Sequence, residues 1–213
     1  MTKFGVLGSG EVGQTLAKGL QDLGDEVRIG SRDPKKLADY TKKTRIAAGT
    51  FAEVAAWAEA LVLSVKGNAA EEALRQAGVQ NFSGKLVIDT TNPIAEEEPQ
   101  DGVIKYFTGP NESLMERLQR AAPRARFVKA FNSVGSDSMV KPKFRGTRPT
   151  MFYCGDDPAA RREVARLLDQ LGWEAADMGT AAAARAIEPL AMLWCIPGFR
   201  EDRWTHAFKL LTR

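Results

Sequence analysis

The sequence predicts an α/β fold built on a doubly wound, mostly parallel sheet with a helical tail at its C-terminus. The chain opens on a short apolar strand, which runs directly into the pattern Gly8-x-Gly10-x-x-Gly13 and a helical stripe. Further apolar runs alternate with helical segments, at residues 60–65, 85–89 and 126–131. Continuous apolar strands between helices are typical of a parallel sheet covered on both faces.

The glycine pattern is the dinucleotide-binding fingerprint of Rossmann-type folds. Gly8 permits a tight turn, Gly10 lets the backbone approach a pyrophosphate, and Gly13 lets the next helix pack closely on the strand. The free N–H groups at the start of that helix then face the phosphates. We expect the whole turn to contact the cofactor, which adds Ser9, Glu11 and Val12.

The end of the second strand, expected at residues 26–30, predicts which dinucleotide binds. NAD-binding chains place Asp or Glu there to bind the ribose 2′-hydroxyl, whereas this chain has Ser31 and Arg32. A hydroxyl and a guanidinium attract a 2′-phosphate, and Lys36 adds a third contact from a short helix capped by Asp33. A solvated basic turn is the alternative interpretation. The sequence therefore favours NADP as the cofactor.

Polar and small residues follow the later strands at the places where ligands of such sheets bind, beyond the carboxyl ends. Their hydroxyl and amide groups can hydrogen-bond ribose or the nicotinamide carboxamide, although loop Ser and Asn also satisfy local backbone groups. Val65 and Pro93 are expected to be apolar walls against the cofactor rings. The candidate contacts are Ser64, Val65, Lys66, Asn92, Pro93, Ala130 and Asn132.

The C-terminal segment is predicted as two helices, one over residues 180–194 and a second, amphipathic one over residues 202–211, with a break at residues 196–198. This pair is either a lid over the hydride-transfer cleft or a packed core pair or dimer interface. Apolar stripes at helical spacing favour packing. We therefore expect an NADP-binding domain at residues 1–178 and a helical segment at residues 179–213 that packs on it or on a dimer partner.

Composition and charge predict a cytoplasmic enzyme. The 213 residues carry a net charge of +3 with no dense basic run interleaved with aromatics, which argues against nucleic acid as a partner. The N-terminus shows no signal peptide, and no apolar run reaches membrane-spanning length. Cys154 and Cys195 lack metal-ligand spacing, so reduced cysteines and no metal site are expected.

Several motifs occur together in an order that resembles a known family. The most specific are Lys-Ala-Phe-Asn-Ser at residues 129–133 and Cys-Gly-Asp-Asp at residues 154–157. Thr-Asn-Pro at residues 91–93 and Glu-Pro-Leu at residues 188–190 accompany them. Over essentially its whole length, the chain resembles the NADP oxidoreductases that depend on the deazaflavin coenzyme F420. It is also similar to the related cytosolic reductase domain of membrane metalloreductases.

The resemblance implies hydride transfer between NADPH and a small-molecule acceptor with a deazaflavin, flavin or quinone-like ring stacked over the nicotinamide. It also implies that Ser31, Arg32 and Lys36 hold the 2′-phosphate. Lys66 departs from the apolar residue that family members often carry, and we expect it to steady negative charge on a reduced acceptor.

No acid–base constellation stands out, which is consistent with direct hydride transfer and leaves catalytic residues unassigned. Two alternatives stay open at this point. One is an NADPH-dependent reductase of a small imine or carbonyl compound, with a proton donor on the long loop at residues 92–111. The other is a protein that senses NADP without turning it over. In each case the apolar tail predicts a homodimer.

Overall fold

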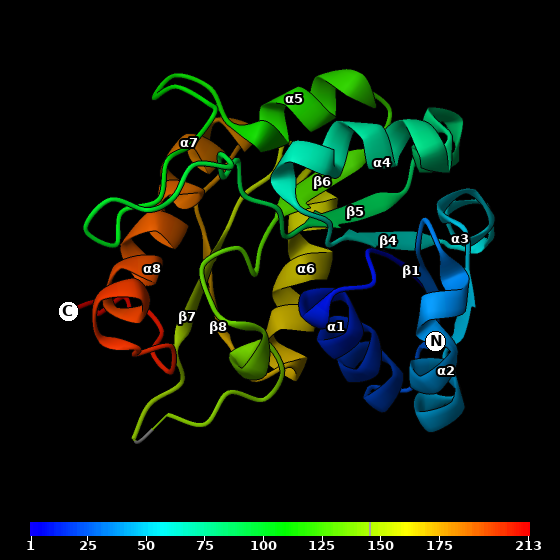
Figure 1. The fold of residues 1–213 in the computed structure, drawn as a ribbon, viewed down its shortest axis with the longest axis horizontal. Coiled ribbons are helices and arrows are strands. Elements are labelled where there is room, and N and C mark those ends of the chain that lie inside the picture. Colours follow the sequence, from blue (N-terminus) through cyan, green and yellow to red (C-terminus); the bar gives the residue numbers. More distant parts are fainter. Residues whose placement is uncertain (145) are drawn as a thin grey trace.

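Six parallel strands form the central sheet, in the order β3-β2-β1-β4-β5-β6 (Figure 1). The computed structural model describes residues 1–144 and 146–213. The strand order changes direction between β1 and β4, which is the switch point where doubly wound sheets bind ligands. The predicted fold class is confirmed. The strands are β1 (Lys3–Leu7), β2 (Glu26–Gly30), β3 (Ala47–Gly49), β4 (Ala60–Leu63), β5 (Leu86–Asp89) and β6 (Arg126–Lys129).

Helices cover both faces of this sheet because its strands are apolar on both sides. Val62 packs with α1 and α6 on one face, and its neighbour Leu61 packs with α3, α4 and α5 on the other (Figure 1). The helices are α1 (Glu11–Asp22), α2 (Ala38–Thr44), α3 (Phe51–Trp57), α4 (Ala70–Ala77), α5 (Leu114–Ala121), α6 (Pro158–Gln170), α7 (Ala184–Ile187) and α8 (Pro189–Glu201). Short 3-10 helices occur at Pro34–Leu37, Gly67–Ala69, Val79–Phe82, Ser136–Ser138 and Ala181–Ala183.

Local sequence signals set several helix boundaries. The Asp157 side chain accepts a hydrogen bond of 2.7 Å from the Ala160 N–H and caps α6. Asp33 accepts from the Lys35 N–H at 3.2 Å and caps the 3-10 helix Pro34–Leu37. After α1, Gly24 has a φ of +92°, a conformation that favours glycine and ends the helix.

A second, two-stranded parallel sheet follows the central one, made of β7 (Thr150–Tyr153) and β8 (Glu174–Asp177). An isolated antiparallel bridge between Lys129 and Cys154 joins it to the end of β6. Both cysteines are free, Cys154 fully buried and Cys195 half-buried. Burial raises the pKa of the Cys154 thiol to about 12.

The prediction of two C-terminal helices is wrong in its second part. α8 continues through Pro197 to Glu201, and residues 202–213 form an extended tail rather than a helix. Asp202 ends α8 in the left-handed conformation, with a φ of +50°. No helix in the described part of the chain is long and apolar enough to cross a membrane.

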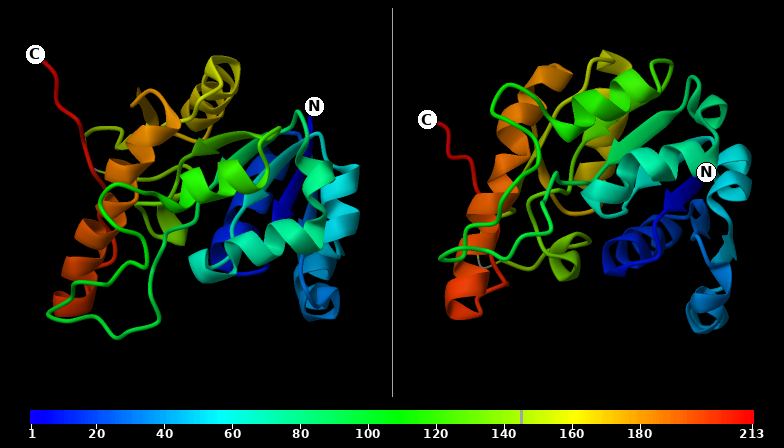
Figure 2. Two further views of the ribbon diagram at one scale, coloured as in Figure 1. Left: turned by 90° about the horizontal axis from the view of Figure 1, so that it is seen from above. Right: turned by 45° about the horizontal axis from the view of Figure 1, so that its top comes forward.

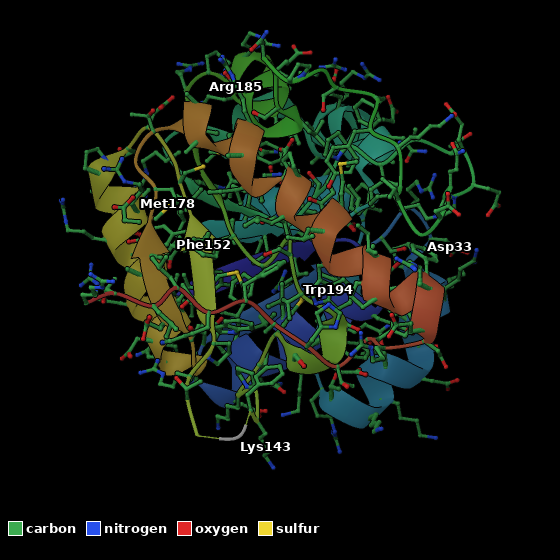
Figure 3. All side chains as sticks on the ribbon, turned by 90° about the vertical axis from the view of Figure 1, so that its left-hand side faces the viewer. Asp33, Lys143, Phe152, Met178, Arg185 and Trp194 are labelled. Carbon is green, nitrogen blue, oxygen red and sulfur yellow. The ribbon has the colours of Figure 1, made fainter. Side chains whose placement is uncertain are left out.

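Long-range contacts explain why the tail is extended. The Trp204 ring lies against Gly198, where a β-carbon would stand 2.2 Å from it. The Trp194 indole N–H donates to the His206 carbonyl at 2.8 Å, as the tail passes α8 (Figure 3). The Phe208 carbonyl then accepts from the backbone N–H of Thr150 at 2.9 Å. These tertiary contacts outweigh the helical pattern of residues 202–211, because the segment could not form them as a helix.

Candidate dinucleotide site

The last residues of five strands lie in one row along a single edge of the sheet. Leu7 pairs with Gly30 on one side and with Leu63 on the other. Leu63 pairs with Asp89, and Asp89 pairs with Lys129. The segments that follow these residues therefore emerge side by side, so candidate residues far apart in the sequence meet at one edge.

The glycine turn at this edge has the geometry that its spacing predicts. Gly8 has a φ of +134°, and a β-carbon there would lie 2.4 Å from the carbonyl oxygen of Ser64. A β-carbon on Gly13 would lie 2.1 Å from the carbonyl oxygen of Gly8, so only glycine lets α1 pack this closely. A β-carbon on Gly10 would meet nothing within 4 Å.

The start of α1 is open to a ligand. Gly10 is its N-cap, and among the residues that the structure describes no side chain caps its first turn. The orphan N–H groups of a helix start need acceptors, and phosphate oxygens supply them. This open cradle over Gly10 fits the pyrophosphate of a dinucleotide.

The basic turn after β2 adjoins the glycine turn. The Ser31 hydroxyl donates to the Ser9 hydroxyl at 3.2 Å and accepts from the Asp33 N–H at 3.2 Å. Ser31 is buried, whereas Arg32 and Lys36 are exposed and, within the described ranges, form no ion pair. Two cations without a carboxylate partner beside a buried hydroxyl fit a phosphate group.

Next to the glycine turn, a cavity of about 470 Å³ opens beyond the ends of β4 and β5. Five candidate residues line it, namely Val12, Ser64, Val65, Lys66 and Asn92. Its other lining residues are Gly67, Asn68, Thr90, Thr91, Ile94, Ala95 and Glu96, of which Asn68, Ala95 and Glu96 escaped sequence reasoning. The cavity is large enough for a flat ring system, and its polar side chains are hydroxyls and amides together with one cation, Lys66, and one carboxylate, Glu96.

Three candidates lie behind this cavity rather than in its lining: Pro93, Ala130 and Asn132, all buried. Asn132 holds the cavity wall in place, since its Nδ2 donates to Asn92 Oδ1 at 3.0 Å and to the Ile187 carbonyl at 3.0 Å. Asn92 Nδ2 in turn donates to the Asn132 carbonyl at 2.7 Å. Phe131, the residue before Asn132, is buried and has a φ of +63°, a strained conformation of the kind that clusters at functional sites.

Sequence reasoning also missed a cluster of buried charges beneath the cavity. The Lys129 ammonium lies 2.8 Å from Asp89 Oδ2 and 2.9 Å from Glu188 Oε1, and all three residues are buried. The signal was available, because a lysine that ends an apolar strand needs buried partners. The sequence alone does not identify those partners.

Comparisons with known proteins agree with this geometry. Residues 3–93 match the family model described as NADP oxidoreductase, coenzyme F420-dependent. The crystal structure of a candidate F420-dependent NADP-reductase from Arthrobacter sp. FB24 superposes with a TM-score of 0.93 at 35% identity, over 100% of both chains. The F420-dependent NADP reductase of Methanothermobacter marburgensis is 29% identical over 207 residues, 90% of each chain.

A longer relative shares the same unit. Metalloreductase STEAP3 of Rattus norvegicus is 30% identical over 199 residues, which cover 92% of this chain. The chain spans 38% of the length of that relative. The resemblance inferred from the motifs is confirmed, as is NADP as the cofactor of the family. The chain belongs to the family of NADP oxidoreductases that depend on coenzyme F420.

Proposed function

We propose that this protein transfers hydride between NADP(H) and a small acceptor with a deazaflavin, flavin or quinone-like ring. The observation that carries the proposal is the row of strand ends, which runs from the open cradle at Gly10 to the cavity beside Ser64 and Asn92. A dinucleotide laid along this edge would have its phosphates at the start of α1 and its nicotinamide at the cavity.

The residues assigned to the cofactor divide into three groups along that edge. Ser31, Arg32 and Lys36 would hold the 2′-phosphate, and the turn from Gly8 to Gly13 would hold the pyrophosphate. The nicotinamide end would contact Ser64, Val65, Lys66 and Asn92, with Pro93, Ala130 and Asn132 supporting them from behind. When bound, NADPH supplies a hydride, which is two electrons and one proton, to the acceptor.

On the acceptor side, the chain itself contributes apolar walls, one cation and the carboxylate of Glu96, which accepts from Asn68 Nδ2 at 2.8 Å. Val65 and Ile94 are apolar surfaces against which a flat ring can pack, and Lys66 is exposed at the same cavity. A cation at this position favours the added negative charge on a reduced ring. The role of these residues is to bring two rings together and to exclude water, which is the main requirement of direct hydride transfer.

Reduction of an imine or carbonyl compound is the weaker alternative, because it needs a proton donor from the loop at residues 92–111. The phenol of that loop, Tyr106, already donates to the Glu188 carbonyl at 2.6 Å. Burial and the nearby Glu188 carboxylate raise its pKa far above the usual range, and it lines a different cavity. The loop therefore offers no phenolic proton donor to the nicotinamide side.

The test is steady-state NADPH oxidation by the purified chain with F420, FMN, menadione, a cyclic imine and a ferric chelate, each in turn. We expect fast turnover with a ring acceptor. Loss of NADPH only with the imine would support the alternative reductase, and no turnover with any acceptor would support a sensor. Lys66→Met should slow transfer to the ring acceptor and change NADPH binding by no more than about 3-fold, because the phosphate contacts are untouched. Lys43→Met, at an exposed lysine of α2, should change neither.

We also propose that the protein is a homodimer that packs through α8. Its outward side exposes Leu193 and Phe199 to 55% and 51%, while the rest of the helix is also apolar. A helix that is apolar all round is usually buried, and a second copy would cover this side. Analytical ultracentrifugation should give a dimer for the wild type and a monomer for Leu193→Glu. A monomeric wild type would contradict the proposal.

A further inference from the structure

The Lys129 ammonium lies at the centre of a buried network beneath the cavity. Besides its two carboxylate partners, it donates to the carbonyl oxygen of Thr91 at 2.6 Å. The ammonium thus faces three oxygens, one hydrogen-bonded carbonyl and two carboxylates at ion-pair distance. The side chains of Lys129, Asp89 and Glu188 are 0%, 0% and 2% exposed, which keeps water from competing for these bonds.

One arm of the network holds the wall of the cavity. Asp89 Oδ1 accepts from the Thr91 N–H at 2.9 Å and from the Thr91 hydroxyl at 2.7 Å. Lys129 binds the carbonyl of the same residue, so both polar groups of the Thr91 backbone are held from below. Thr91 and its neighbours Thr90 and Asn92 line the cavity assigned to the nicotinamide.

The other arm reaches the C-terminal helices. Glu188 connects α7 to α8, and its carboxylate accepts from the backbone N–H groups of Leu114 and Met115 at the start of α5, at 2.9 and 3.0 Å. Glu188 also lines a second cavity of about 470 Å³, between α8 and the loop at residues 92–111. Those two segments lie side by side in both views of Figure 2. The network thus stands between the two cavities.

Stability alone does not account for this cluster. Burial by itself lowers the pKa of Lys129, but the Asp89 and Glu188 carboxylates outweigh it and raise that pKa above the usual value. Two carboxylates and one ammonium leave an excess negative charge in the interior. Well-packed apolar side chains of similar volume in place of such a buried ionic cluster often give a protein that is at least as stable. A buried polar network of this kind specifies one arrangement of the elements that it joins.

We propose that Lys129 is a positioning residue for hydride transfer. Its ammonium fixes the Thr90–Asn92 wall of the nicotinamide cavity relative to Glu188 and α8, so that the cofactor ring keeps one position against that wall. The inference rests on the proposed function for the assignment of the cavity. It does not require a particular acceptor.

The principal variant is Lys129→Met with Asp89→Asn, which keeps the excess charge of the cluster unchanged. Asn at position 89 can still accept from Thr91, while the ties to Glu188 and to the Thr91 carbonyl are lost. Glu188→Gln is the second variant and loosens only the arm to α8. Arg126→Met is the matched control, because Arg126 begins the same strand at the opposite edge of the sheet and bonds Glu163 at 3.1 Å.

Three readouts are measured on each folded variant: the NADPH dissociation constant, the fluorescence of bound NADPH and single-turnover hydride transfer with stereospecifically deuterated NADPH. We expect the dissociation constant to stay within about 3-fold, because the adenosine and phosphate contacts are untouched. Hydride transfer should slow by about 10- to 100-fold, as a shift of about 1 Å at the reacting centre does. Bound-NADPH fluorescence should change, and the deuterium label should lose facial selectivity.

Normal fluorescence and normal hydride transfer in either folded variant would overturn the positioning role. If the principal variant does not fold, Glu188→Gln decides, since it removes one buried charge and leaves Lys129 paired with Asp89. Wild-type protein that binds NADPH but reduces no acceptor would contradict the proposed function instead. In that case an unchanged fluorescence of bound NADPH in Glu188→Gln would still refute the inference.

Discussion

Replacing Gly10 by alanine should separate cofactor binding from folding. Gly10 has φ −76° and ψ 179°, an extended conformation that alanine adopts freely, and its β-carbon would touch nothing within 4 Å. Loss of a favourable N-cap residue costs up to about 1 kcal/mol. The smaller entropy of the unfolded chain returns about 0.4–1 kcal/mol, so the free energy of unfolding should change by less than about 1 kcal/mol.

The same methyl group should interfere with the cofactor, because it would point into the space assigned to the pyrophosphate. Crowding by one methyl group costs about 1–3 kcal/mol, which corresponds to a rise of about 5- to 150-fold in the NADPH dissociation constant. Calorimetric titration measures binding, and urea unfolding measures stability. Gly13→Ala is the contrasting variant: its methyl group would meet the Gly8 carbonyl, so stability should fall together with binding. Gly10→Ala protein that binds NADPH like the wild type would refute the placement of the phosphates.

Three further predictions concern other parts of the molecule. Arg32→Asp should weaken NADPH binding by about 10- to 100-fold and spare NADH, since a charged hydrogen bond of about 1.5–3 kcal/mol is lost; Arg124→Asp, exposed at the opposite edge of the sheet, should leave the preference for NADPH unchanged. The hydrogen bond from Arg185 lowers the pKa of Glu116 below its usual value of 4.5. The stabilisation of the folded state by this ionised carboxylate is therefore present above pH 4.5 and is lost as the pH falls through the depressed pKa. Acid unfolding of Glu116→Gln should therefore depend less steeply on pH than that of the wild type, and equal slopes would contradict this. Gly198→Ala should displace Trp204 and speed tryptic cleavage of the tail, whereas Gly109→Ala, where a β-carbon has open space, should be cleaved like the wild type.

The parts of the fold that depend on local signals could be predicted from the sequence. Apolar runs located β4, β5 and β6, and the cap residue Asp33 located a helix start, because neighbouring residues determine both. The glycine spacing predicted the turn, and the structure shows the close contact between Gly13 and Gly8 that requires glycine at position 13. In the structure Ser31 lies next to Ser9, because the ends of β1 and β2 are neighbours.

The features that escaped prediction depend on contacts between segments far apart in the chain. The tail after Asp202 has a helical pattern, but Trp194 and Thr150 supply the partners that keep it extended. Lys129 is visibly unusual in its strand, yet only the fold brings Asp89 and Glu188 to it. Asn132 was expected at the cofactor, whereas the register of β5 and β6 places it behind Asn92. Periodicity reports which residues are buried and does not report their partners.

The central claim is that the turn after β2 binds the 2′-phosphate of NADPH. Calorimetric titration of the purified chain with NADPH and with NADH tests it most directly. A charged contact to that phosphate should make NADPH bind at least about 10-fold more tightly than NADH. Equal affinity for the two nucleotides, or binding of neither, would contradict the account.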